Sequence, residues 1–228
     1  MYVSTQSKKG WTLQAEYYNK ILYPLQDMVI PAFSDTPFYL TGGTALSRGY
    51  YSHRYSDDLD YFVNYHPNFM KISDVQTDKI RKIFNNIKIA VKDKYFYRVF
   101  VADEKLKIEM INDVPSHAGT LINHPELGLI DSKENILANK LTAVVDRALP
   151  KDIVDIYFLL KDGFDLKRAL TDAESKAAGI APLLIAKIFA EFDYSLISRE
   201  IKWINPVPDA KIDNFLHNIS IRIAKGTL

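Results

Sequence analysis

Two aspartates separated by one residue, Asp58 and Asp60, are the side chains in this sequence that best fit metal chemistry. They stand at the start of an apolar run, Leu59 to Val63, which is typical of a buried strand. In a strand, residues i and i+2 point to the same face about 6–7 Å apart, so the two carboxylates converge and Asp57 points elsewhere. Convergent carboxylates are the ligands that a hard divalent cation such as Mg2+ prefers.

A pair of glycines precedes these aspartates in a pattern suited to phosphate binding. Phe38–Leu40 is predicted to be a short strand, Gly42-Gly43-Thr44 a tight turn and Ala45–Tyr51 a short helix. Glycines let the backbone approach a ligand, and free N–H groups at a helix N-terminus favour an anion. Each feature alone is more often only a turn or a cap. In this order they indicate metal-assisted chemistry on a nucleoside triphosphate.

Both segments resemble a known signature, that of the polymerase-β-like nucleotidyltransferase superfamily. They are GGTAL at 42–46 and RYSDDLD at 54–60. More narrowly, the chain resembles the AbiEii/AbiGii-type toxin family, in which a Gly-Gly-Ser/Thr turn precedes an Arg-x-Ser-x-Asp-Leu/Ile-Asp segment. The resemblance implies that Asp58 and Asp60 bind Mg2+ (or Mn2+). It also implies that the β- and γ-phosphates of an NTP contact Gly42, Gly43 and Thr44.

A third acid stands on a later predicted strand, Lys105–Ile111, which follows the strand Tyr95–Val101 through a hairpin turn at 102–104. Alternation sends Lys107, Glu109 and Ile111 to one face. In the superfamily a third carboxylate lies beside the first two, and Glu109 is the candidate for it, although many relatives have Asp there. On the pattern alone, a charge on an edge strand is an equal alternative.

A second group of charged residues follows an irregular connector. NKL at 139–141, Arg147 and KDIVDIY at 151–157 resemble the lysine helix and the Arg/Lys-Asp-x-x-Asp-Ile/Leu-Tyr segment of the same family. The resemblance implies that Lys140 neutralises charge in the transition state, and that Asp152 orients Lys140 or Arg147. The predicted nucleotide contacts are Lys140, Arg147, Asp152 and Asp155. A salt-bridge network between two helices is the alternative, equally weighted for Arg147 and Asp155.

The order of elements predicts an α/β (α+β) protein with two domains. Residues 1–128 are expected to form the nucleotidyltransferase core, a polymerase-β-like mixed sheet with flanking helices, and residues 129–228 a C-terminal helical bundle. The active cleft is expected between them. The other helices that periodicity predicts span 11–30, 67–86, 166–178, 182–192 and 209–225, and a short strand is predicted at 126–130.

The overall composition limits the class of protein and the partners to be expected. The 228 residues are 47% hydrophobic and 25% charged, which is ordinary for a globular protein. The chain has no cysteine, no apolar signal segment near its start and no run of roughly 18–20 apolar residues. We therefore expect a cytoplasmic protein without a membrane partner. The net charge of +1 means that any nucleic-acid binding depends on a local patch.

Such a patch is predicted between residues 79 and 98. The window contains one acid, Asp93, and interleaved aromatics at 84 and 95–97. Its basic residues are Lys79, Arg81, Lys82, Lys88, Lys92, Lys94 and Arg98. Basic residues beside aromatics suit RNA phosphates and bases, so this face is a candidate guide for an RNA acceptor. A solvated surface whose aromatics belong to the core is the competing interpretation.

The resemblance implies a reaction. An acceptor hydroxyl attacks the α-phosphorus of an NTP, the nucleoside monophosphate is transferred, and pyrophosphate is released. Family members are toxins of toxin–antitoxin or phage-defence pairs, and some relatives act on tRNA, so a separate antitoxin and a tRNA acceptor are expected partners. Three alternatives stay open: transfer to a protein or small-molecule hydroxyl, an NTP-binding switch without turnover, and a purely structural interaction protein.

Overall fold

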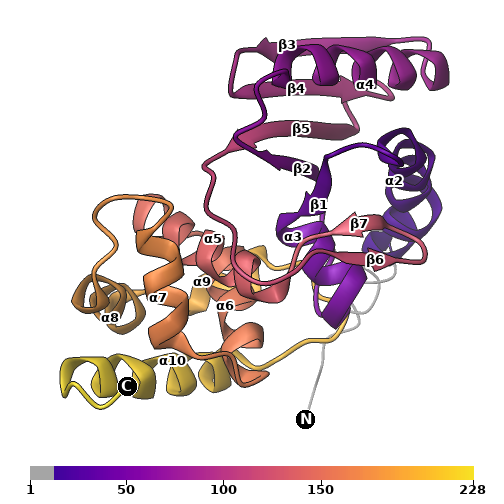
Figure 1. Cartoon of the computed structure of the whole chain (residues 1–228). Coiled ribbons are helices and arrows are strands. Elements are labelled where there is room, and N and C mark those ends of the chain that lie inside the picture. Colours follow the sequence, from indigo (N-terminus) through magenta and orange to yellow (C-terminus); the bar gives the residue numbers. More distant parts are fainter. Residues whose placement is uncertain (1–12) are drawn as a thin grey trace.

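The computed structural model of the chain describes residues 13–228. Within that range, one seven-stranded mixed sheet and a group of C-terminal helices lie side by side (Figure 1). The expected mixed sheet with flanking helices and a helical bundle is therefore confirmed. The buried apolar side chains of both parts form one cluster. The domain boundary at residue 128 stays a prediction.

The centre of the sheet is built from β1 (Tyr39–Thr41), β2 (Leu59–Asn64) and β5 (Leu106–Asp113). Strand β2 alternates buried and half-buried residues, as its sequence LDYFVN predicts. It pairs with β1 in antiparallel and with β5 in parallel orientation. The parallel register places Asp60 directly beside Glu109. The sheet therefore brings the two predicted acidic segments together.

The outer strands are β3 (Ile87–Lys92), β4 (Phe96–Val101), β6 (Ile122–His124) and β7 (Gly128–Ile130), in the order β3-β4-β5-β2-β1-β7-β6. Sequence reasoning predicted β4, β5 and β7 but missed β3 and β6. Both missed strands lie at an edge of the sheet and are largely exposed.

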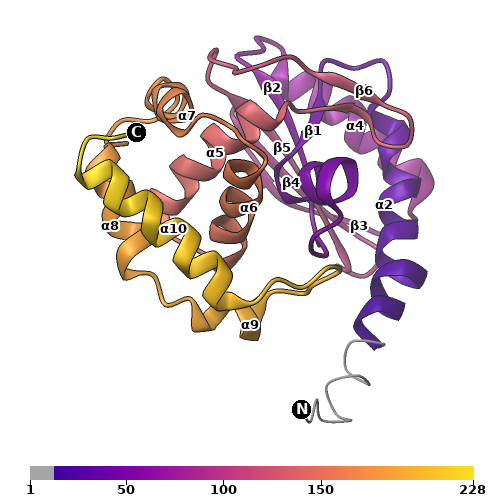
Figure 2. The same ribbon diagram turned by 90° about the horizontal axis from the view of Figure 1, so that it is seen from below.

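The helices before β1 cover one side of the sheet. The chain is helical from residue 13 to 33, ending with η1 (Tyr18–Leu22), α2 (Tyr23–Val29) and η2 (Ile30–Phe33). This confirms the predicted helix over 11–30, except for residues 11–12, which lie outside the described residues. Helix α4 (Phe69–Ile83) lies on the same side and is shorter than predicted (Figure 2).

The Gly-Gly segment forms α3 (Gly42–Thr44), which continues without a break into η3 (Ala45–Tyr51). Gly42 has φ +66°, a conformation that a residue with a Cβ rarely adopts. The glycine is therefore needed where the chain leaves β1 and enters the helix.

The C-terminal helices pack on the opposite side of the sheet from α2 and α4 (Figure 2). They are α5 (Lys133–Asp146), α6 (Pro150–Lys161), α7 (Leu166–Glu174), α8 (Pro182–Glu191), α9 (Ser195–Glu200) and α10 (Asp209–Ala224). All but the short α9 were predicted. Among the described helices, none combines the length and the apolar character required to cross a membrane.

Ser132 fixes the start of α5, the helix that carries Lys140. Its buried hydroxyl accepts a hydrogen bond from the Asn135 amide at 3.1 Å and donates one to the Ala118 carbonyl. Because both bonds disappear in Ser132→Ala, we expect the free energy of unfolding to fall by about 1–2 kcal/mol in chemical denaturation. The exposed Ser198 is the control, and Ser198→Ala is expected to change it by less than about 0.5 kcal/mol. Equal values for the two variants would contradict the capping role.

Candidate active site

A cavity of about 410 Å3 lies between the sheet and the C-terminal helices. From the sheet side it is lined by both glycines, Asp58, Asp60 and Glu109. From the helical side it is lined by Asn139, Lys140, Arg147, Lys151 and Asp152. The structure therefore brings most of the predicted site residues to one cleft, at the junction where it was expected.

The sheet wall of the cleft is an oxygen-rich acidic cluster. Burial, together with the neighbouring charges of Asp58 and Glu109, raises the pKa of Asp60 to about 7. Three carboxylates that repel one another are stabilised by a cation, and oxygen-only ligands are those that Mg2+ and Mn2+ accept. The donor set therefore fits a hard divalent cation.

Two basic side chains from the sheet itself already contact this cluster. Lys107 Nζ lies 3.1 Å from Asp58 Oδ2 and 3.1 Å from Glu109 Oε1. Arg98 Nη2 lies 2.6 Å from the same Glu109 oxygen. Burial alone would raise the pKa of Glu109, but these two cations hold it below its usual value. With these ion pairs in place, residues 13–228 contain no set of three Asp, Glu, His or Cys side chains arranged to hold a metal ion.

The two glycines fit tightly against the polar side chains around them. A Cβ on Gly42 would stand 2.8 Å from Asp60 Oδ2, and one on Gly43 would stand 2.5 Å from Arg54 Nη2. Side chains at these positions would therefore push into the cleft-lining groups. The Thr44 hydroxyl faces the other way, toward Ser56 Oγ at 2.9 Å and the Asp58 carbonyl, and it does not line the cavity.

Lys140 faces the carboxylates from α5 and is held in place by two aspartates of α6. Its Nζ lies 2.7 Å from Asp152 Oδ1 and 2.6 Å from Asp155 Oδ2. Burial opposes its charge, yet these two carboxylates raise the pKa of Lys140 above its usual value. Arg147 Nε is 3.2 Å from Asp152 Oδ2. Asp152 thus contacts both basic residues, as predicted for an orienting group.

Asp155 is a fully buried hub beneath the cleft and is not part of its lining. Arg54 donates to both its oxygens, at 2.8 and 2.7 Å, and His53 Nε2 lies 2.8 Å from one of them. Burial alone would raise the pKa of Asp155, but Arg54 and Lys140 hold it well below its usual value. Asp155 therefore supports Arg54 and Lys140 from behind, which matches the salt-bridge interpretation of this residue.

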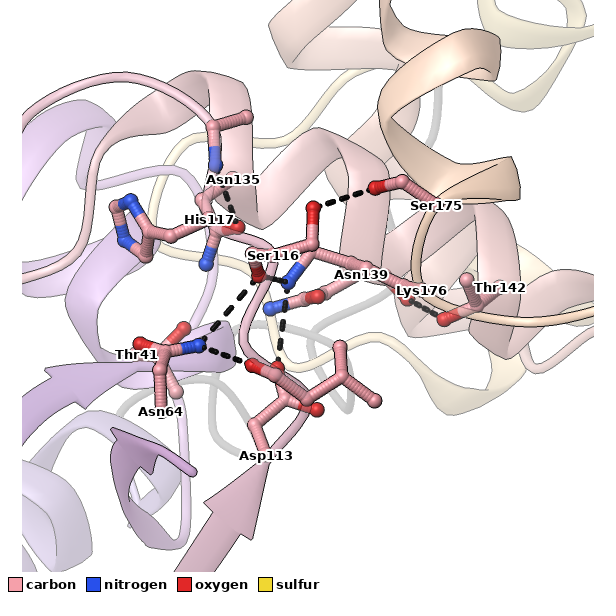
Figure 3. A network of polar contacts seen from close by, with 12 residues as sticks. Thr41, Asn64, Asp113, Ser116, His117, Asn135, Asn139, Thr142, Ser175 and Lys176 are labelled. Atoms are coloured by element: carbon pink, nitrogen blue, oxygen red, sulfur yellow. Dashed lines mark hydrogen bonds and ion pairs between the residues drawn. The ribbon is translucent and has the colours of Figure 1, made fainter. Parts of the chain in front are cut away.

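Sequence reasoning missed several cleft residues. Lys176, in the turn after α7, donates to the Ser116 carbonyl at 3.0 Å and lies 3.2 Å from Asp113 Oδ2 at the end of β5, as Figure 3 shows. The Asn139 amide lies next to it, and its Nδ2 is buried without a partner among the described residues. No pattern marks Lys176, but strand alternation had already placed Lys107 on the face of Glu109.

Comparison with known proteins agrees with this geometry. Residues 25–216 match the family described as "Nucleotidyl transferase AbiEii toxin, Type IV TA system". An uncharacterized protein of Aquifex aeolicus is 30% identical over 176 residues, 72% of each chain.

Solved structures share the fold. JHP933 from Helicobacter pylori superposes with a TM-score of 0.62 at 22% identity, covering 90% of this chain and 91% of its own. MenT4, a nucleotidyltransferase toxin of Mycobacterium tuberculosis, superposes with a TM-score of 0.59 at 15% identity, covering 94% and 89%. At these identities the likeness concerns the fold.

Asp60 should make stability depend on pH in the absence of divalent cations. Its pKa of about 7 lies above the ordinary value, so its protonated form stabilises the fold at low pH, and that stabilisation is lost as the pH rises through 7. Asp60→Asn is therefore expected to raise the free energy of unfolding at pH 8 by on the order of 1–2 kcal/mol, with little effect at pH 4.

The measurement is chemical denaturation in a chelator at both pH values. Asp103→Asn, in the exposed turn between β4 and β5, is the control and should change neither value. A destabilised Asp60→Asn protein at pH 8 would contradict the repulsion described here.

Removing the charge of Asp155 should lower the stability of the fold, whereas removing that of Asp60 should raise it. Asp155→Asn leaves Arg54 and Lys140 buried with less compensation, so we expect a loss of about 3–5 kcal/mol in the free energy of unfolding. Asp162 is the matched control, because it pairs with a lysine as Asp155 does, accepts a second bond from a tyrosine, and is exposed. Asp162→Asn is expected to cost at most about 1 kcal/mol. Similar losses in both variants would show that Asp155 is no hub.

Proposed function

Because the chain belongs to the AbiEii family of nucleotidyltransferase toxins from type IV toxin–antitoxin systems, we propose that its cleft transfers a nucleoside monophosphate from an NTP to an RNA acceptor. The observation that carries the proposal is the opposition of two charge groups across one cavity. Asp58, Asp60 and Glu109 line it from the sheet, and Lys140 and Arg147 line it from the helices. A triphosphate with its counter-cation has the complementary charge for both walls.

Asp58, Asp60 and Glu109 are the residues that would hold Mg2+ or Mn2+. A divalent cation bound there supplies positive charge to the phosphates and lowers the pKa of an attacking hydroxyl. The fit is supported by the oxygen-only donor set and by the burial and mutual repulsion that raise the pKa of Asp60.

The other residues bind phosphate and position the reacting groups. The backbone at Gly42 and Gly43 begins a helix beside Asp60, where N–H groups favour an anion. Lys140, fixed by Asp152 and Asp155, neutralises charge that builds up on the phosphates as the transition state forms. Arg147 is half-exposed at the rim and adds a second positive charge there.

The bond changes follow from this placement. The acceptor oxygen forms a bond to the α-phosphorus, the bond from that phosphorus to the bridging oxygen breaks, and pyrophosphate leaves with the bonding electrons. The attacking hydroxyl gives up its proton to solvent water in the cleft.

Family membership also implies a separate antitoxin protein and an NTP substrate. We further propose a role in phage defence and a cytoplasmic location, which accord with an intracellular supply of NTP and RNA.

For the acceptor, we propose that RNA, such as tRNA, approaches over the hairpin of β3 and β4. Lys94 and Tyr95 are exposed there, and Tyr95 is 50% exposed. Two of the basic residues are partly neutralised, since Lys88 pairs with Glu104 at 2.7 Å and Lys92 with Asp74 at 2.6 Å. Phe84 and Tyr97 belong to the core, so base stacking on this face depends on Tyr95 and its neighbour Phe96.

An NTP-binding switch without turnover is the second candidate, and the internal pairing of Lys107 with two of the acids is the observation that favours it. Transfer to a protein or small-molecule hydroxyl would use the same site with a different acceptor.

The direct test supplies each of the four NTPs, labelled at the α-phosphate, with Mg2+ and total cellular RNA. We expect one or more RNA species to acquire label, and the label to vanish with Asp58→Asn or Asp60→Asn although both variants melt no lower than the parent protein. Tight NTP binding without any labelled product would favour the switch, and label in protein would identify a protein acceptor.

The RNA surface is tested by reversing three charges, in Lys88→Glu, Lys92→Glu and Lys94→Glu together. RNA affinity should fall, and its salt dependence should weaken by a little under one log unit per log of salt for each lost phosphate contact. NTP binding should not change. The matched control reverses Lys161, Lys187 and Lys211, exposed lysines on the C-terminal helices. If both triple variants bind RNA alike, the acceptor approaches elsewhere.

A further inference from the structure

Lys107 occupies a special place in the acidic cluster. It stands two residues before Glu109 on β5, so strand alternation puts both side chains on the face that carries the acids. Its Nζ is equidistant, at 3.1 Å, from Asp58, which immediately precedes β2, and from Glu109 on β5. The ammonium group of Lys107 therefore occupies the position that a metal ion bound by both carboxylates would take.

The ammonium group and a divalent cation cannot share these oxygens. Both need Asp58 Oδ2, and like charges a few ångströms apart repel each other in a partly buried site. Arg98 already donates to Glu109 at 2.6 Å, so the carboxylate keeps one partner when Lys107 leaves. Metal entry therefore requires Lys107 to move, while Glu109 stays oriented.

Lys107 is free to move, unlike the lysine on the other wall. Its side chain is 26% exposed and ends on a flexible four-carbon stem that reaches the solvent. Lys140 is 9% exposed and is fixed between two fully buried aspartates. The cleft thus contains one fixed ammonium group, suited to phosphate, and one that is movable.

We propose that Lys107 is a displaceable internal cation, which bridges Asp58 and Glu109 in the metal-free protein and is expelled when a divalent cation binds. The inference rests on the metal site of the proposed function. It adds that metal affinity is set by competition with a residue of the same sheet. The concentration of free divalent cation in the cell then determines whether Asp58 and Glu109 hold the metal or remain paired with Lys107.

The first test measures Mn2+ binding by calorimetry, without nucleotide. Lys107→Met should bind Mn2+ about tenfold more tightly than the parent protein, the order expected when a competing unit charge is removed. Lys107→Arg keeps the charge and should not gain affinity. Lys105→Met removes an exposed lysine of the adjacent turn and should match the parent. Unchanged or weaker Mn2+ binding in a folded Lys107→Met protein would overturn the proposal.

The second test follows the lysine itself in the unaltered protein. An amine-acylating reagent and peptide mass spectrometry report the reactivity of Lys107, with Lys105 as an internal reference. Reactivity of Lys107 should rise when Mg2+ saturates the protein, and an unchanged ratio to Lys105 would overturn displacement. If Mn2+ binds in an Asp60-dependent way but neither test responds, only this inference fails. If no Mn2+ binds, the proposed metal site fails with it.

Discussion

Repulsion among three carboxylates that the sheet forces together is the interaction on which the rest of this structure depends. The parallel pairing of β2 with β5 sets Asp60 beside Glu109, and Asp58 reaches the same place from the start of β2. Such a cluster opposes folding unless positive charge is supplied. Lys107 and Arg98 supply it from the sheet, which leaves a site that is both stable without a metal and suited to binding one.

The helical part completes the site by fixing its other wall. Asp155 connects Lys140 on α5 with His53 and Arg54, which belong to the segment leading to the acidic pair. The same segment is fastened from the C-terminal side, because Tyr55 donates a backbone hydrogen bond to Lys202. Buried ion pairs of this kind add little net stability but are costly to break, so they specify geometry. The cleft is consequently a product of both parts, and neither wall is positioned independently.

Local patterns were sufficient for the features that depend on a single element. Alternation in LDYFVN and KIEMI predicted which acids share a face, and helical periodicity predicted α4, α7, α8 and α10. The family signature supplied the connection between distant segments. What the sequence could not show is which charges face the cleft. Asp152 and Asp155 are one helical turn apart and look alike in the sequence, yet only Asp152 lines the cavity. That difference depends on the approach of Arg54 from across the fold.

The two strands that were not predicted, β3 and β6, both lie at an edge of the sheet. In β3, Ile87, Ile89 and Val91 alternate with Lys88, Ala90 and Lys92, so a strand pattern was present but was overlooked, whereas β6 has only three residues and gives no pattern. Lys107 was visible in the alternation but was not recognised as part of the site, because a lysine next to a predicted metal ligand contradicts the expectation of an acidic, metal-filled site.

The central claim is that this cleft catalyses transfer at the α-phosphorus of an NTP. Parallel reactions with one NTP, labelled in one case at the α-phosphate and in the other at the γ-phosphate, test it most directly. The account predicts that the acceptor acquires the α-label only, while the γ-label appears in released pyrophosphate. Acceptor labelling from the γ-position, or γ-label released as inorganic phosphate with no α-label transferred, would contradict it.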